Sequence, residues 1–242
     1  LFYYSAASLF TPSFGDVNHA TALAGLLTLV ETAMGFGTIA LLIAYLPVLY
    51  GAYNRREARL LTLDDPTGER IQPGAVIRVH APDGDVERLY QFFAEWELWT
   101  AEILESHVSY PMLAYFRSQQ AGQSWITALG VVLDAAALTY AAVIGADQRE
   151  PYFMYRRGRL ALTQIGRRLH VPRGPETTVS RELIAIAYER LKDTKLPLDP
   201  DLDRIFERLQ AVRGMYGPDL QALIDYLVAP AGFWGHSAEL EG

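Results

Sequence analysis

The chain contains no cysteine. Disulfide bonds and cysteine-ligated metal sites are therefore excluded, and the composition fits a cytoplasmic location for the C-terminal part of the chain. Basic residues are also missing over a long stretch, because all 21 Lys and Arg lie at Arg55 or beyond it. The net charge is −7, and the region after Arg55 is itself acidic, so a nucleic-acid partner is not expected.

The absence of charge leaves one long apolar stretch near the N-terminus. From Ala20 to about Ala52 the only charged residue is Glu31. A helix of this length, at about 1.5 Å per residue, exceeds the roughly 30 Å hydrocarbon core of a bilayer. The sequence therefore predicts a transmembrane helix. Three arginines crowd its end, and by the positive-inside rule that end faces the cytoplasm. They are Arg55, Arg56 and Arg59.

A short helix and a polar loop come before the apolar stretch. Leu1–Phe10 is too short to span a bilayer, and its backbone ends are tolerated at membrane depth only inside protein. The loop that follows consists of Thr11, Pro12, Ser13, Phe14, Gly15 and Asp16. This order resembles the pore helix, selectivity filter and inner helix of the potassium-channel superfamily, where the loop is Thr-Val-Gly-Tyr-Gly-Asp. Thr11, Gly15 and Asp16 match that loop, and Phe14 replaces its tyrosine.

The resemblance covers about the first fifty residues and implies a fold and a function. The fold is an all-α membrane protein with a re-entrant pore helix and filter loop, a long inner transmembrane helix and a mainly helical cytoplasmic domain. The function is passive conduction of K⁺ or another monovalent cation by a homotetramer in the bacterial inner membrane. The implied parent protein is multi-pass, with an outer helix before Leu1, and needs no cofactor beyond the permeating ion.

The resemblance also implies roles for the loop residues. The backbone carbonyls of residues 11–15 line the filter, and Asp16 supports it from behind. Pro12 and Ser13 depart from the family pattern: proline lacks an N–H, and a serine held at φ > 0 costs roughly 1–2 kcal/mol. A less selective pore, or a membrane-anchored sensor that keeps a degenerate pore scaffold without conducting, therefore stays open as an alternative.

Glu31 lies about a third of the way along the apolar helix. A carboxylate at membrane depth usually faces protein or a water-filled cavity. Related channels carry a glutamate near this place, so the resemblance implies that Glu31 hydrogen bonds to the backbone of the pore helix and filter and holds the loop in shape. A protonated carboxyl that satisfies a neighbouring helix is the alternative. Gly35 and Gly37 are candidate gating hinges or sites of close helix packing.

The rest of the chain divides into residues 53–86 and 87–242. Turn signals in the first segment predict a linker, with a short strand over Ala75–His80. The second predicts a helical cytoplasmic domain for assembly or gating, with an unknown cytoplasmic regulator as a candidate partner. Trp125–Ile144 has the length of a transmembrane helix, but Asp134 costs about 3 kcal/mol at its centre, so a buried helix is the preferred interpretation.

No catalytic constellation is present, and an enzyme is not expected. The residues that most resemble metal ligands are Glu97, Glu102, Glu105 and His107. Their aromatic and aliphatic neighbours favour an amphipathic helix instead of a metal site. The basic run Tyr155–Arg159 is either a solvated helix face or a contact for lipid headgroups.

Overall fold

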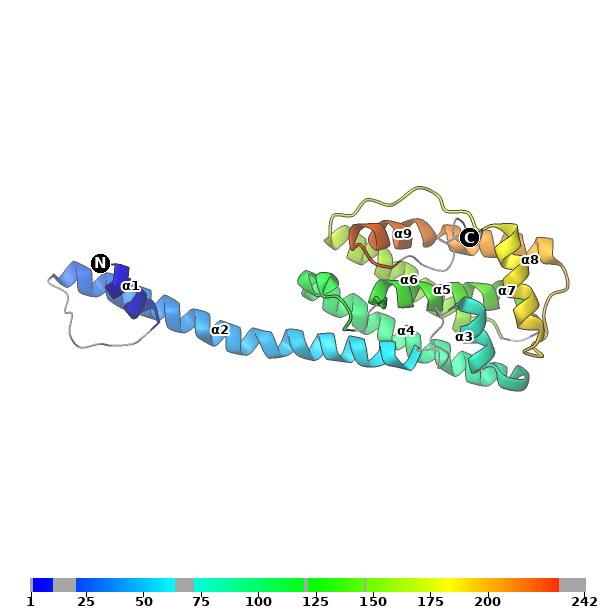
Figure 1. The fold of residues 1–242 in the computed structure, drawn as a ribbon, viewed down its shortest axis with the longest axis horizontal. Helices are drawn as coiled ribbons and strands as arrows, with labels where there is room; N and C mark the ends of the chain where they lie inside the picture. Colours follow the sequence, from blue (N-terminus) through cyan, green and yellow to red (C-terminus); the bar gives the residue numbers. More distant parts are fainter. Residues whose placement is uncertain (1, 11–20, 64–71, 120–121, 146, 231–242) are drawn as a thin grey trace. The chain divides into compact units, whose positions relative to one another are not determined.

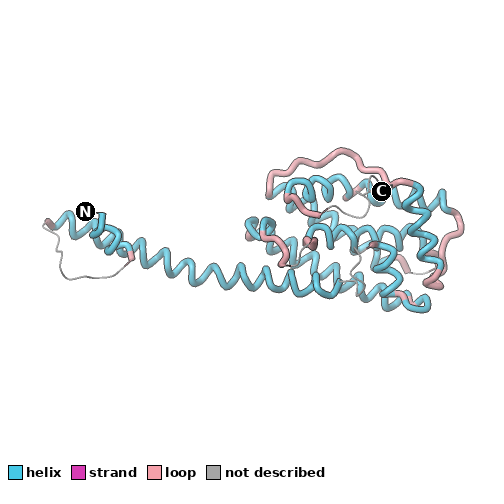
Figure 2. Tube along the Cα trace, in the orientation of Figure 1, coloured by secondary structure: helices cyan, strands magenta, loops and turns pink. Residues whose placement is uncertain are grey.

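The computed structural model describes residues 2–10, 21–63, 72–119, 122–145 and 147–230. Every regular element in these ranges is a helix (Figures 1 and 2). Internal contacts divide the chain into Leu1–Ala52, here called unit 1, and Tyr53–Gly242, called unit 2. The all-helical prediction is therefore confirmed over the described residues.

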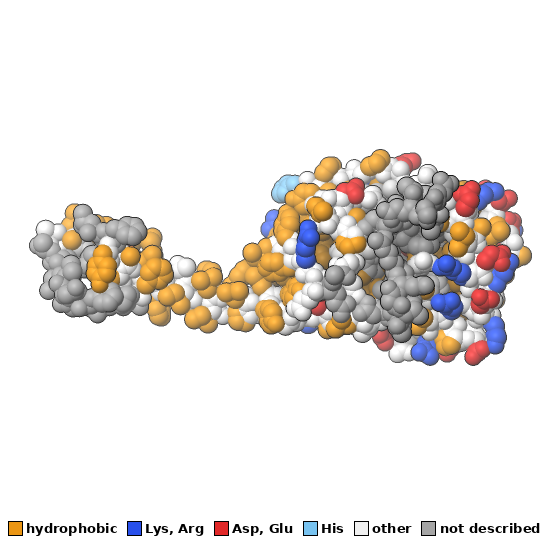
Figure 3. All heavy atoms as spheres, viewed as in Figure 1, with side chains coloured by type: hydrophobic (Ala, Val, Ile, Leu, Met, Phe, Trp, Pro, Cys, Tyr) orange, Lys and Arg blue, Asp and Glu red, His pale blue; other side chains and the backbone are white. Residues whose placement is uncertain are grey.

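Unit 1 contains α1, Phe2–Leu9, and most of α2, Ala22–Leu60. The hydroxyl of Thr21 accepts a hydrogen bond from the backbone N–H of Ala24 at 3.2 Å, so it caps an orphan donor at the start of α2. Apolar side chains point outward all around the helix, and only 6% of its most apolar window is buried (Figure 3). A helix that is hydrophobic on every side needs an apolar surrounding, which a bilayer supplies.

Unit 2 is built from the end of α2 and ten further helical elements among the described residues. They are η1 (Leu61–Leu63), α3 (Pro73–His80), η2 (Pro82–Gly84), α4 (Val86–Ser109), η3 (Pro111–Tyr115), α5 (Trp125–Ala142), α6 (Arg149–Arg168), α7 (Arg181–Lys192), α8 (Leu202–Gly214) and α9 (Gly217–Tyr226). Side-chain caps start three of the helices: Asp85 caps α4, Ser180 caps α7 and Asp201 caps α8.

Helix α5 occupies the centre of unit 2. It packs against α3, α4, α6, α8 and α9. Although it is long and apolar enough to cross a membrane, 83% of its apolar window is buried within the protein. The arrangement agrees with the interpretation of Trp125–Ile144 as a buried core helix.

Residues 53–86 differ from the prediction of a linker with a short strand. Helix α2 continues through this segment to Leu60, and Ala75–His80 belongs to α3 instead of a strand. Val76 and Ile77 are buried in the core of unit 2. The β-branched residues suggested a strand, but Pro73 at the first helical turn and packing against α5 and α7 outweigh that weak preference.

Candidate functional site

The candidate site in unit 1 is the contact between α1 and α2. The hydroxyl of Ser5 donates to a carboxylate oxygen of Glu31 at 2.7 Å. The next residue of α2, Thr32, donates from its hydroxyl to the backbone carbonyl of Ser8 at 3.0 Å, about one turn further along α1. Residue numbers rise together on both helices, so α1 and α2 run in the same direction along their contact.

Gly35, about one turn further along α2, meets Leu9, the next residue of α1. Gly35 is buried, and a Cβ built on it would clash with the carbonyl oxygen of Leu9. No side chain fits there unless the end of α1 moves away. Gly37 has no atom within 4 Å of such a Cβ, so only Gly35 meets α1 closely. Of the two glycines proposed as hinges or packing sites, Gly35 has the geometry of a packing site.

The predicted filter residues, Thr11–Asp16, lie outside the described residues. The ends on either side of residues 11–20 are described. Leu9 contacts α2 at Gly35, which is thirteen residues from Ala22, or about 20 Å along the helix at 1.5 Å per residue.

The charges around this contact favour a cation. Glu31 is the only charged residue between Ala20 and Ala52, and no Lys or Arg precedes Arg55. The C-terminal end of α1 carries the partial negative charge of a helix dipole.

A second polar cluster lies in the core of unit 2. The guanidinium of Arg213 donates to Asp134 at 3.2 Å and to the hydroxyl of Thr177 at 3.0 Å. The hydroxyl of Tyr216 donates to the same oxygen of Asp134 at 2.7 Å. The pKa of Tyr216 is raised well above its usual value, mainly by burial and to a smaller extent by the charge of Asp134. The phenol therefore stays protonated.

This cluster was missed by sequence reasoning. Asp134 stood out as a charge within an apolar run, but Arg213 and Tyr216 lie about eighty residues away in the sequence. No local pattern pairs them. Asp134 accepts hydrogen bonds from Arg213 at the end of α8 and from Tyr216 at the start of α9. The carboxylate therefore joins α5 to both of these helices.

The acidic residues of α4 do not form a metal site. Among the described residues, no group of three or more His, Asp or Glu side chains is placed to hold a metal ion. Glu97 instead accepts a hydrogen bond from Arg157, and Glu105 accepts one from Ser109. His107 is buried against Trp125, with ring centroids 4.6 Å apart.

The basic run of α6 is divided between the core and the surface. Tyr155 and Gly158 are buried, and Arg157 pairs with Glu97. Arg156 and Arg159 are exposed. The run is therefore one edge of an amphipathic helix and is not a continuous basic patch.

Comparisons with protein-family models, with curated proteins and with solved structures find no match to this chain. The function must therefore be inferred from the chain's own residues. The two features that bear on it are the α1–α2 contact and the polar loop that joins those helices.

Proposed function

We propose that the chain is a subunit of a tetrameric, potassium-type cation channel that conducts ions passively across the bacterial inner membrane. In this proposal the backbone carbonyls of residues 11–15 line the filter, and Asp16 supports it. One loop supplies only a quarter of each carbonyl ring, so four copies are required. Unit 2 lies in the cytoplasm, where it serves assembly or gating.

The register of α1 on α2 carries the proposal. A short helix that runs beside a membrane helix in the same direction, and ends about 20 Å along it, has to be followed by a returning connection. That is the chain path of a re-entrant pore segment. The contacts at Ser5, Ser8 and Leu9 supply what such a segment needs, namely a protein surface that shields its backbone from lipid.

The charge distribution supports the orientation. Arg55 and Arg59 follow the apolar stretch directly, and no Lys or Arg precedes them. By the positive-inside rule this end faces the cytoplasm, so the Thr11–Asp16 loop faces outward. Glu31, held by the hydroxyl of Ser5, is the residue we assign to filter support.

Two residues favour a second candidate function. Pro12 removes an N–H, and Ser13 stands where the family has a glycine. If Pro12 and Ser13 prevent the carbonyls of residues 11–15 from forming rings, the subunit keeps the helices of a channel but does not conduct ions. It would then act as a membrane-anchored sensor or interaction protein.

Reversal potentials separate the two functions. The full-length protein is reconstituted in planar bilayers between potassium and sodium solutions. A potential near the potassium Nernst value supports a selective channel, and a potential near zero with clear current indicates a non-selective cation pore. No current from folded, tetrameric protein would contradict conduction and favour the sensor. Replacing Pro12 by Val together with Ser13 by Gly should sharpen selectivity only in a working pore.

A further inference from the structure

An exposed apolar patch lies on η3 in unit 2. Met112, Tyr115 and Phe116 are 45%, 54% and 41% exposed. Residues three apart eclipse one another in a 3₁₀ helix, so Met112 and Tyr115 share one face. The hydroxyls of Tyr115 and Tyr226 are hydrogen bonded at 2.9 Å, which adds the exposed end of α9. These four residues are called the η3 patch below.

Side chains from α2 hold η3 in place. The guanidinium of Arg56 donates to the carbonyls of Leu113 and Phe116, at 2.8 Å and 2.6 Å. Arg56 is almost fully buried by this contact. The hydroxyl of Tyr53 donates to the carbonyl of Arg117 at 3.1 Å, and the rings of Tyr53 and Phe116 meet edge to face. The position of the η3 patch is thus fixed relative to the first turns of unit 2.

Those turns directly follow the apolar stretch. Tyr53 comes next after Ala52, and residues 53–56 cover about 6 Å of helix at 1.5 Å per residue. The headgroup layer on each side of a bilayer is about 5–8 Å thick. If α2 spans the membrane and the apolar stretch ends at the inner edge of the hydrocarbon core, the backbone bonded to Tyr53 and Arg56 lies at the depth of this layer.

The composition of the surface fits the same layer. Tyrosine is enriched at membrane interfaces, where its ring lies among acyl carbons and its hydroxyl reaches water. Arg117 directly follows Phe116 and Arg55 directly precedes Arg56; both are exposed, and neither forms an ion pair with a described carboxylate. Two such cations complement the anionic lipids of a cytoplasmic leaflet.

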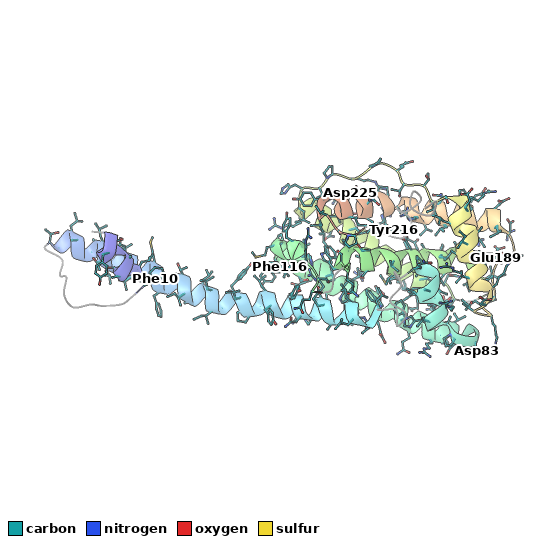
Figure 4. The ribbon with its side chains drawn as sticks, viewed as in Figure 1. Phe10, Asp83, Phe116, Glu189, Tyr216 and Asp225 are labelled. Carbon is teal, nitrogen blue, oxygen red and sulfur yellow. The ribbon has the colours of Figure 1, made fainter. Side chains whose placement is uncertain are left out.

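The opposite end of unit 2 has a different surface. Charged side chains gather over α3, α7 and α8 (Figure 3). Asp83 and Glu189 lie at that end, and Phe116 lies at the other (Figure 4). Unit 2 therefore has a charged end, which suits water, and an end that carries aromatic side chains.

We propose that the η3 patch inserts into the headgroup layer of an anionic bilayer and docks unit 2 on the membrane from which α2 emerges. The proposal rests on the membrane-spanning role given to α2 above. Docking couples the end of α2 to unit 2, since Arg56 joins them through η3. Movement of α2 on gating would then have to carry η3 along the membrane surface.

The absence of native cysteine allows a direct test by site-directed spin labelling. Three variants, Met112→Cys, Leu41→Cys and Ile186→Cys, are each labelled in the full chain and reconstituted in vesicles that contain phosphatidylglycerol. All three native side chains are exposed, so none of the substitutions removes core packing. Leu41 reports on the membrane helix, and Ile186 of α7 is the matched apolar control at the charged end.

Collision of the label with oxygen and with a water-soluble nickel chelate measures its depth. We expect the ratio of oxygen to nickel accessibility at position 112 to be several-fold higher than at 186 and lower than at 41. A label at 112 that behaves like the one at 186, while 41 lies in lipid, overturns the docking proposal and leaves the membrane anchor intact.

Two other outcomes are also decisive. Low accessibility of position 112 to both reagents means that protein covers the η3 patch, either a second copy or another segment of this chain, and overturns lipid docking. Aqueous behaviour at position 41 would overturn the membrane-spanning role of α2, and docking with it.

Discussion

The two longest apolar helices of this protein, α2 and α5, have opposite surroundings. Both are long and apolar enough to cross a bilayer, with mean hydropathies of 1.9 and 1.5 over their best windows. Only 6% of the window in α2 is buried, whereas 83% of the window in α5 is buried. The difference shows that length and composition select candidates for a membrane span, and that tertiary partners decide between them.

The ionisable residue in each helix gives the physical reason. Asp134 of α5 meets Arg213 and Tyr216, which come from distant parts of unit 2 and satisfy the carboxylate. Glu31 of α2 is satisfied by one hydroxyl from the neighbouring α1. A carboxylate within an apolar helix is costly unless polar groups bind it. The residues that bind it therefore show which part of the protein surrounds that helix.

The largest expected effect comes from removing the charge that α5 brings into the core. Asp134→Asn keeps the volume but leaves the guanidinium of Arg213 buried without a counter-charge. We expect a loss of about 3–5 kcal/mol in the free energy of unfolding of unit 2. Denaturant unfolding followed by tryptophan fluorescence measures it. The double variant Asp134→Leu, Arg213→Met should recover most of the loss, and a single-variant loss below about 1 kcal/mol would contradict a structural ion pair.

The next largest effect concerns two glycines of unit 1, one closely packed and one with open space around it. Gly35→Ala places a methyl group against the carbonyl of Leu9 and should displace α1 at a cost of about 1–3 kcal/mol. Gly37→Ala is the matched control, because its methyl group meets no atom. Hydrogen exchange of residues 2–10 should speed up in the first variant only. Equal exchange in both variants would refute the α1–α2 contact.

A pH effect tests the packing of α4 on α5. Burial and the nearby charge of Arg56 lower the pKa of His107 to about 3, against about 6.5 in an unfolded chain. The unfolded state therefore binds the proton first, so stability is full above about pH 6.5 and falls as the pH drops towards 3. The expected slope is about 1 kcal/mol per pH unit.

Unfolding curves between about pH 7 and about pH 5 measure this slope, above the range in which most carboxylates titrate. His107→Gln should flatten it. His170→Gln is the control, since His170 is exposed on the surface of unit 2. A slope that persists unchanged in His107→Gln would show that this histidine is not the group responsible.

The smallest expected effect concerns the hydrogen bond that Ser5 donates to Glu31. Ser5→Ala removes the donor and should weaken the α1–α2 contact by about 0.5–1.5 kcal/mol. Ser106→Ala is a suitable control, since that hydroxyl bonds only within α4. Exchange of the α1 amides should rise modestly in the first variant and stay unchanged in the second. No change in either would mean that Glu31 is satisfied without Ser5.

Local patterns predicted several elements well. Most of the apolar stretch from Ala20 to about Ala52 lies within α2, and the buried helix preferred for Trp125–Ile144 corresponds to α5. The prediction was wrong for Ala75–His80, where β-branched residues form α3 because its face packs into the core. The assignments to Thr11–Asp16 stay predictions. Glu31 was expected to hydrogen bond to the short helix before the loop, and Ser5 of α1 does donate to it through its side chain. The contact of Gly35 with Leu9 of α1 was not predicted.

What the sequence determined by itself is local and additive: helical periodicity, the caps, the uncharged length of α2 and the arginines at its end. Each of these depends on residues within a few turns of one another. The tertiary structure alone decided that Arg213 and Tyr216 meet Asp134, that Arg56 anchors η3, and that Gly35 has no room for a Cβ. These outcomes depend on partners dozens of residues away, and close packing allows only one arrangement of them.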